Sequence, residues 1–252
     1  LVIDSLLLWE ENEGIFTAEK VFYNKTIPAN FEYFANGIPP YNSAIGLRLQ
    51  GSGTRNYPQK SWRLYAEDYY QYPTFEHKFF PDEYQNNYEK LILRIGGTDW
   101  KRTLMRDQIA HNLAKNLNKD LMCSPINNVL TFLNGKFYGI AQLMERQDDN
   151  FIAEKYNIEK SSITALEKNY YYTLDELKYA PNYNCGKEWF DLIDTLEFLD
   201  MQKNGLEYLN TKIDLDNFID YIILQTFLQN VDWPHNNVLF WKSTELDNKW
   251  RW

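Results

Sequence analysis

Segments with strand character and segments with helix character lie in different halves of this sequence, and this segregation limits the possible folds most. Residues Ile45–Gln50 alternate apolar and polar side chains, which predicts a strand buried on one face. The dipeptide Asn134-Gly135 is favoured in tight turns and predicts a β-hairpin. The other segments of strand composition are Ser61–Tyr65, Leu91–Ile95, Val129–Leu133, Tyr138–Met144 and Val238–Trp241, the last with Trp250–Trp252 as its expected hairpin partner.

Helical signals dominate the second half of the chain. One helix is expected early, from about Thr103, because apolar residues recur at every fourth position: Met105, Ile109, Leu113 and Leu117. Later helices are expected at Asp149–Tyr156, Glu188–Met201 and Asp214–Gln229. Apolar residues nearly encircle the last helix, which predicts that it is central and buried. A sheet-rich first half before a mostly helical second half predicts an α+β fold.

Composition limits the classes of partner. The chain has 252 residues, enough for one domain of two lobes or for two small domains. Its net charge of -9 repels phosphate backbones, so nucleic acid is not an expected partner, although basic groups or a divalent cation can still hold one nucleotide. No stretch is long and apolar enough to span a membrane. Cys123 and Cys185 can pair or stay apart, and residues 157–186, with Tyr170-Tyr171-Tyr172 and Pro181, show no clear pattern.

A carboxylate and an amide five residues apart, Asp232 and Asn237, form one candidate site. The carboxylate can orient an attacking hydroxyl and accept its proton, and the amide oxygen can ligate Mg²⁺. Spacing alone is uninformative, because the pairs Asp82/Asn87 and Asp107/Asn112 share it. Asp232 differs in lying between an apolar helix and an apolar strand, which can hold a site in place. The alternative is a Pro-containing turn with local backbone hydrogen bonds, and His235 has a minor role at most.

Two further segments could meet a phosphate or a cation. Residues 51–60 contain glycines that let a backbone approach phosphates, with basic side chains available as counter-charges: Arg55, Lys60 and Arg63. The alternative is a hairpin turn with solvated basic groups. Glu145-Arg146 precedes Asp148 and Asp149, an acidic cluster that could bind a cation or a nucleotide edge. Here the alternative is that one aspartate caps the next helix.

In order and in detail, these segments resemble the spore coat protein H (CotH) kinase family. The resembling segments are Gly46–Arg55 with Tyr57–Ser61, Leu104–Asp107, Leu133–Gly139 with Met144–Arg146, and Asn230–Asn237. The resemblance implies a divergent, two-lobed protein-kinase-like fold. It places a sheet-rich, nucleotide-binding lobe at residues 1–146 and a mostly helical lobe with the catalytic loop at residues 147–252. It also implies binding of ATP and Mg²⁺ or Mn²⁺, and phosphorylation of Ser or Thr in a protein substrate.

The same resemblance implies roles for particular residues. Asp232 corresponds to the catalytic aspartate and Asn237 to a metal ligand. Nucleotide-binding roles fall on Lys60 with Arg55 at the phosphates, on Glu145 near the adenine-contacting hinge, and on Trp250 as a ring that stacks on the purine. Members of the family carry an Asp-x-Asp shortly after a Trp-rich strand like residues 249–252, where this chain stops. We therefore expect a longer parent protein, and very weak transfer without that motif.

Other functions stay open at the level of the sequence. The fold could serve as a pseudokinase or a coat-like interaction module without efficient transfer. The acidic, aromatic-rich composition also fits a carbohydrate-active or carbohydrate-binding domain, for which Glu145 and Asp232 are the carboxylate pair to consider. Export or surface association is expected from the resemblance, whereas the substrate and the oligomeric state are not predicted.

Overall fold

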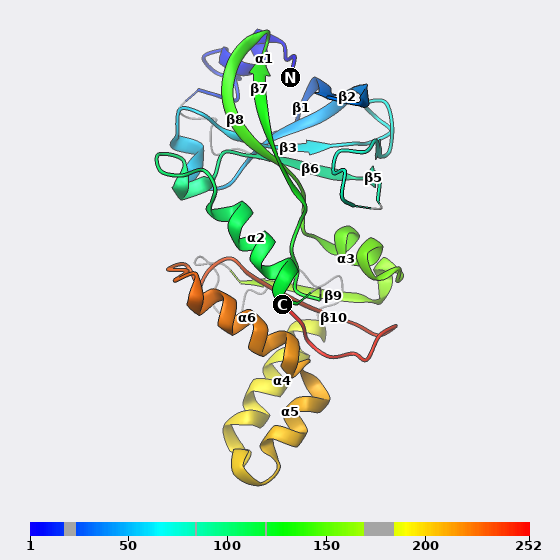
Figure 1. Cartoon of the computed structure of the whole chain (residues 1–252), viewed down its shortest axis with the longest axis vertical. Coiled ribbons are helices and arrows are strands. Elements are labelled where there is room, and N and C mark those ends of the chain that lie inside the picture. Colours follow the sequence, from blue (N-terminus) through cyan, green and yellow to red (C-terminus); the bar gives the residue numbers. More distant parts are fainter. Residues whose placement is uncertain (18–23, 84, 119, 169–183) are drawn as a thin grey trace. The chain divides into compact units, whose positions relative to one another are not determined.

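The computed structural model describes residues 1–17, 24–83, 85–118, 120–168 and 184–252 (Figure 1). The segment with Tyr170-Tyr171-Tyr172 and Pro181, and the side chain of Cys185, lie outside the described residues. The chain divides into two compact units. The first unit comprises Leu1–Ile109 and Ser124–Arg146, and the second comprises Ala110–Cys123 and Gln147–Trp252. Strands and helices occur together, so the predicted α+β class is confirmed.

The first unit is built on a six-stranded antiparallel sheet with strand order β1-β2-β3-β6-β8-β7. Its strands are β1 (Ile27–Ala35), β2 (Ile38–Gln50), β3 (Ser61–Tyr65), β6 (Lys90–Arg94), β7 (Ile126–Leu133) and β8 (Lys136–Glu145). A short helix α1 (Ser5–Trp9) and the two-stranded pair of β4 (Phe75–Glu76) and β5 (Asn87–Tyr88) complete the unit. One face of the sheet carries the core, in which Leu47, Trp62 and Leu93 are buried.

The predicted hairpin is confirmed between β7 and β8. Asn134 and Gly135 form its turn, with φ angles of 49° and 76°. Both angles fall in the left-handed region, which Asn and Gly adopt more readily than other residues. Register along the hairpin shifts between Thr131 and Phe132, where the strand is irregular.

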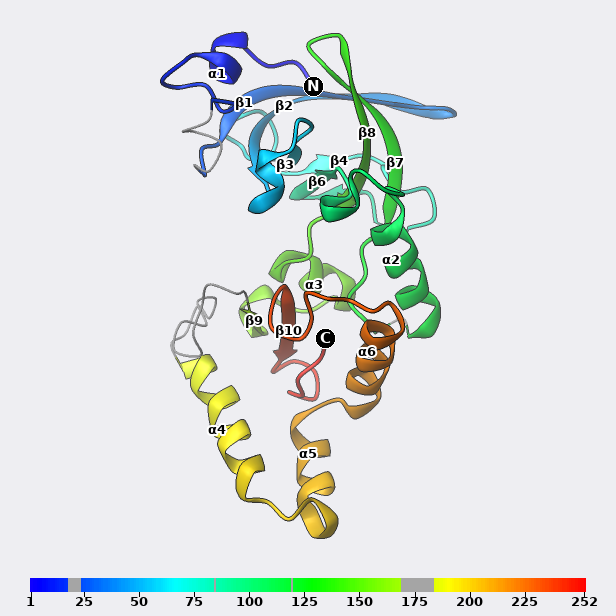
Figure 2. The ribbon, with the colours of Figure 1, turned by 90° about the vertical axis from the view of Figure 1, so that its left-hand side faces the viewer.

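The second unit combines helices with a two-stranded sheet. Its helices are α3 (Asp149–Tyr156), α4 (Asn184–Phe198), α5 (Leu206–Lys212) and α6 (Leu215–Phe227), and α2 (Arg106–Leu117) begins in the first unit and ends in the second. Figure 2 shows the chain reversing direction between α4 and α5. Strand β10 (Val238–Ser243) pairs antiparallel with β9 (Ile163–Lys168). The hydrophobic core of this unit includes the buried residues Leu192, Phe240, Trp250 and Trp252.

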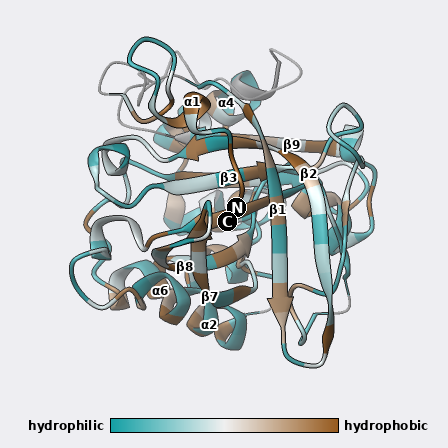
Figure 3. Ribbon diagram, turned by 90° about the horizontal axis from the view of Figure 1, so that it is seen from above, coloured by the Kyte–Doolittle hydropathy of each residue, from teal (hydrophilic) through white to brown (hydrophobic). Residues whose placement is uncertain are grey.

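The predicted burial of α6 is wrong. Ile219, Ile223 and Phe227 are 51%, 52% and 74% exposed, although the helix itself forms where expected. Only one side of α6 packs on the core, through Leu215, Phe218 and Tyr221. Polar and apolar residues are mixed along the helix (Figure 3), so a high apolar content did not require burial on every side. The apolar residues that recur at every fourth position along α2 and just before it, Met105, Ile109, Leu113 and Leu117, are likewise exposed.

Strand β9 was not predicted, since it begins in the segment that shows no clear pattern. It is a second partner of β10. The expected pairing of Trp250–Trp252 with β10 is present at one position, where Arg251 and Trp241 form an isolated antiparallel bridge and exchange backbone hydrogen bonds of 2.8 and 2.9 Å. The last residue is also held by a side chain of α6. The backbone N–H of Trp252 donates to Asn217 Oδ1 at 2.7 Å.

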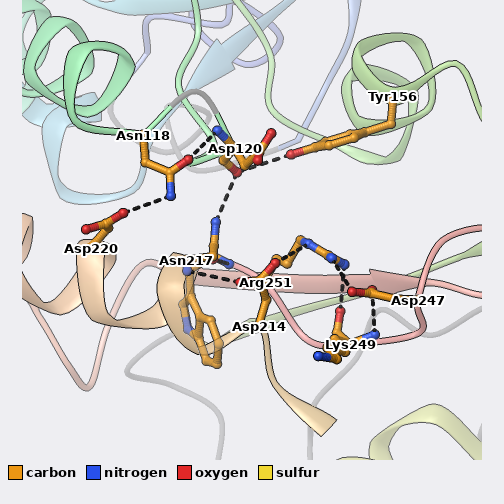
Figure 4. A network of polar contacts seen from close by, with 10 residues as sticks. Asn118, Asp120, Tyr156, Asp214, Asn217, Asp220, Asp247, Lys249 and Arg251 are labelled. Atoms are coloured by element: carbon orange, nitrogen blue, oxygen red, sulfur yellow. Dashed lines mark hydrogen bonds and ion pairs between the residues drawn. The ribbon is translucent and has the colours of Figure 1, made fainter. Parts of the chain in front are cut away.

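Figure 4 shows the polar network that fixes the beginning of α6. Asp214 caps the helix by accepting from the Asn217 N–H at 3.1 Å, and its carboxylate pairs with Arg251 at 3.1 Å. Asn217 is 1% exposed, and its Nδ2 donates to the Asp120 carbonyl at 3.0 Å. Arg251 also pairs with Asp247 at 2.7 Å. One buried amide therefore joins the end of the chain to the loop after α2.

Replacing Asn217 by alanine should destabilise the protein by about 2 kcal/mol, because the buried Trp252 N–H loses its partner and the Asp120 carbonyl keeps only the Tyr156 hydroxyl of its two described donors. The expected result is a lower midpoint of urea unfolding followed by fluorescence. Asn116→Ala is the matched control, since Asn116 lies on the exposed side of α2 and bonds only its own helix. Equal midpoints for the two variants would contradict this role for Asn217.

Candidate functional site

The structure brings Asp232 and Asn237 together. Both lie in the loop that links α6 to β10, and Asn237 Nδ2 donates to Asp232 Oδ2 at 3.3 Å. Asp232 is half-buried and Asn237 is exposed, so the pair is open to a ligand on one side. The roles expected for them, catalytic aspartate and metal ligand, stay predictions.

Local hydrogen bonds shape the loop. The Asp232 N–H donates to Asn230 Oδ1 at 3.1 Å, and the Asp232 carbonyl accepts from the Asn236 N–H at 3.0 Å. Asn237 has a φ of 54°, in the left-handed region that asparagine tolerates better than most residues. These are the bonds expected of the turn alternative. Turn and site are therefore compatible, because the turn is what sets the two side chains side by side.

Trp233 anchors the loop next to Asp232. Its ring meets the ring of Tyr221 on α6 edge-on, with centroids 6.4 Å apart, and packs against the core of the second unit. Burial raises the pKa of Tyr221 to about 12. The loop is thus attached at the end of α6 and held by the contact between Trp233 and Tyr221. Both restrict where the Asp232 carboxylate can lie.

The donor set of this pair suits a hard cation in part. Mg²⁺ prefers carboxylate, carbonyl and phosphate oxygens, and Asp232 and Asn237 offer a carboxylate and an amide oxygen. Among the described residues, no three His, Cys, Asp or Glu side chains gather into a metal-binding group. The pair therefore fits a cation whose other ligands are phosphate and water oxygens. His235 lies exposed in the same loop.

The equally spaced pair in α2 has different surroundings. Asp107 forms an ion pair with Arg94, so its carboxylate stabilises the beginning of the helix. Asn112 is exposed on the same helix, and its carbonyl accepts from the Asn116 side chain. Context, and not the spacing of five, distinguishes Asp232.

In the first unit, Lys60 is engaged by its own loop. Its ammonium donates to the carbonyls of Arg55 and Tyr57, the latter at 2.6 Å, and burial lowers its pKa. Its backbone N–H donates to the Tyr138 hydroxyl at 2.6 Å. Arg55 donates through Nη2 to Asn24 Oδ1 at 2.9 Å. In this conformation Lys60 therefore stabilises the loop, and its contact with nucleotide phosphates stays a prediction.

The sheet brings a further cation beside this loop. Arg48 on β2 lies directly opposite Arg63 on β3. Arg63 was recognised in the sequence as an available counter-charge, but Arg48 was missed. The alternation Leu47-Arg48-Leu49 was the signal that could have found it, because alternation places Arg48 on the face away from the core.

Glu145 ends β8 opposite Leu91 and is 5% exposed. Its Oε1 lies 3.4 Å from Gln85 Nε2. Nearby, Asp148 caps α3 by accepting from the Asn150 N–H at 3.1 Å, so the capping alternative is confirmed for that residue. Glu145 belongs to the first unit and Asp232 to the second, so their role as a carboxylate pair stays a prediction.

Trp250 is enclosed in the core of the second unit. It is 3% exposed, and its ring lies 5.4 Å from the rings of both Trp189 and Phe240. The Lys242 ammonium lies 5.3 Å from the centre of the same ring. A purine could stack on Trp250 only if this cluster opened, so the stacking role stays a prediction that the packing does not favour.

A model of a known protein family matches most of the chain. The model of the family described as CotH kinase protein matches residues 47–252. These residues include Lys60, the Asp232 loop and strands β3, β6, β7 and β8. No curated protein matches the chain. Among the helices that the structure describes, none has the length and apolar character needed to cross a bilayer.

Because of the Tyr138 hydroxyl, which accepts from the Lys60 N–H, we expect the stability of the protein to depend on alkaline pH. Burial raises the pKa of this hydroxyl from 10.0 to about 12, so the folded state favours the neutral phenol. That contribution to stability is present below pH 10 and is lost as pH rises toward 12. Tyr138→Phe should lower the free energy of unfolding by about 1 kcal/mol at pH 7 and reduce its decline between pH 10 and 12.

Urea unfolding at pH 7, 10 and 11 measures both effects. Tyr69→Phe is the control, because Tyr69 is 88% exposed and its hydroxyl is not required by the loop. If Tyr138→Phe declines with pH as steeply as the unsubstituted protein, the phenol is not the group responsible.

Proposed function

The chain belongs to the CotH kinase protein family, and from this we propose that it is an ATP-dependent kinase that transfers the γ-phosphate to Ser or Thr of a protein. A kinase-like function holds at the level of the family. ATP, the protein acceptor and Ser/Thr specificity are our proposal. The observation that supports it is the hydrogen-bonded pair of Asp232 and Asn237 within the matched residues.

Each member of the pair has a role that suits its chemistry. The Asp232 carboxylate would accept a hydrogen bond from the substrate hydroxyl, orient its oxygen and take up its proton. Asn237 Nδ2 donates to the other side of the same carboxylate, which would fix the carboxylate plane while leaving an oxygen for the hydroxyl. A half-buried carboxylate on an anchored turn is held in place without being sealed from substrate.

A divalent cation, Mg²⁺ or Mn²⁺, fits the same pair. The Asn237 amide oxygen would be its ligand from this chain, with phosphate and water oxygens completing the shell. When bound, the cation would neutralise charge on the phosphates. The nucleotide itself we assign to the sheet-rich residues 1–146, as in a two-lobed kinase, with the helical residues 147–252 carrying the acceptor side.

A pseudokinase or coat-like interaction module is the second candidate. It is favoured by Lys60, whose ammonium is already held by the carbonyls of Arg55 and Tyr57. A protein in which that lysine stays committed to its loop would keep the fold and lose efficient transfer. Export or attachment to a spore or cell surface suits either candidate and is part of the proposal.

Asp232→Asn should reduce phosphate transfer about 100-fold or more, because the substituted amide cannot take up the hydroxyl proton. The assay follows label from γ-labelled ATP into an acidic, Ser-rich acceptor protein with Mg²⁺ or Mn²⁺. Nucleotide binding, measured separately by calorimetry, should change little.

Asp82→Asn is the matched control, since Asp82 is exposed and stands five residues before an asparagine like Asp232. It should transfer label as well as the unsubstituted protein. Full transfer by Asp232→Asn would remove Asp232 from the catalytic role. Metal-dependent ATP binding without any transfer would favour the pseudokinase instead.

A further inference from the structure

Two arginines stand directly opposite each other on neighbouring strands of the first unit. Arg48 on β2 pairs in register with Arg63 on β3. Leu47 and Leu64 pair one step away on the core face, so the arginines share the opposite face of the sheet. Both are half-buried. Like charges directly opposite each other destabilise a sheet, and this arrangement needs a compensating reason.

Neutral oxygens are the partners of both guanidinium groups. Arg48 donates through Nε and Nη2 to Thr26 Oγ1, at 3.0 and 2.9 Å. Arg63 donates through Nε to Gln50 Oε1 at 2.8 Å and through Nη1 to the Tyr65 hydroxyl at 3.2 Å. None of the ion pairs recorded between described residues joins either arginine to a carboxylate. The charges are therefore positioned and solvated by dipoles but not neutralised.

More positive charge surrounds the pair. Burial lowers the pKa of Arg63, and Arg146 and Arg48 lower it further. Burial also lowers the pKa of Arg55, to which Arg63 and Arg48 add. Arg63 is thus acted on by Arg48 and Arg146, and Arg55 by Arg48 and Arg63, in a protein whose net charge is -9. A local field of this sign attracts anions.

We propose that Arg48 and Arg63 form an oxyanion site whose ligand is a chain of phosphate groups, and that the phosphates of a nucleotide occupy it. A guanidinium carries five N–H donors in a planar fork that matches phosphate oxygens. Each arginine can therefore keep its neutral partner and still donate to a phosphate. The nucleotide as source of the phosphates rests on the proposed function, whereas the oxyanion site itself does not.

The contacts of Lys60 support the assignment of the phosphates to Arg48 and Arg63. Its ammonium is bound by loop carbonyls, so the lysine expected at the phosphates is engaged in holding residues 55–60. Arg48 and Arg63 lie on the strands that flank this loop, where β2 ends and β3 begins. The loop and the arginine pair would then share the phosphate chain, with the arginines supplying charge.

Calorimetric titration of the whole chain with sodium tripolyphosphate and, separately, with ATP and Mg²⁺ tests the site. Arg48→Gln and Arg63→Gln should each weaken tripolyphosphate binding about tenfold, the loss of one charge-assisted contact. Arg48→Lys keeps the charge but loses the fork, and should bind with intermediate affinity. Lys136→Gln removes the same charge at the exposed turn of the β7–β8 hairpin and should bind like the unsubstituted protein.

The two ligands separate the two proposals. If ATP binds and the arginine variants match the unsubstituted protein, the arginine site is refuted and the proposed function stands. If tripolyphosphate binds through the arginines and ATP does not bind, the oxyanion site stands and the kinase proposal fails. Binding of neither ligand overturns both. Because a variant could also misfold, thermal unfolding is followed too, and tripolyphosphate should raise the midpoint of Lys136→Gln more than that of Arg48→Gln.

Discussion

The register of β2 against β3 is the constraint on which the chemistry of the first unit depends. Leu47 faces Leu64 and Leu49 faces Trp62 on the core side, while Arg48 faces Arg63 on the other. Side chains alternate with a period of two, so a slip of one residue would drive an arginine into the core and expose a leucine. Burying an unpaired guanidinium costs much free energy, so the slipped register would be strongly disfavoured. The register of β2 against β3 is therefore tightly specified.

In the second unit, a buried amide fixes the position of α6. Asn217 sits in the first turn of α6 and bonds both the Asp120 carbonyl and the Trp252 N–H. Asp214, the cap of that helix, is tied to Arg251. With its beginning held by this network and one side packed on the core, α6 delivers its last turn to a defined position. The loop that carries Asp232 begins there and is held again at Trp233.

Local patterns were sufficient to predict many elements but not their surroundings. β3 and α3 form over the residue ranges expected for them, and the β7–β8 turn follows from Asn134-Gly135. Burial of α6 was mispredicted because apolar residues on all sides of a helix do not say which side meets a core. The proximity of Asp232 and Asn237 could be predicted, since a short turn controls it. The carbonyl partners of Lys60 could not, because they depend on the backbone conformation of the loop.

Acidic residues are abundant in this chain, and that makes the surroundings of Arg48 and Arg63 informative. Asp and Glu number 35 against 26 Lys and Arg, and Arg251 and Arg94 each pair with a carboxylate. A carboxylate beside Arg48 or Arg63 would have relieved their repulsion at once. The described partners are a threonine, a glutamine and a tyrosine, which orient a guanidinium without cancelling its charge. Like charges held opposite each other lower the stability of the sheet, and the phosphate site that we propose would offset that cost by binding an anion.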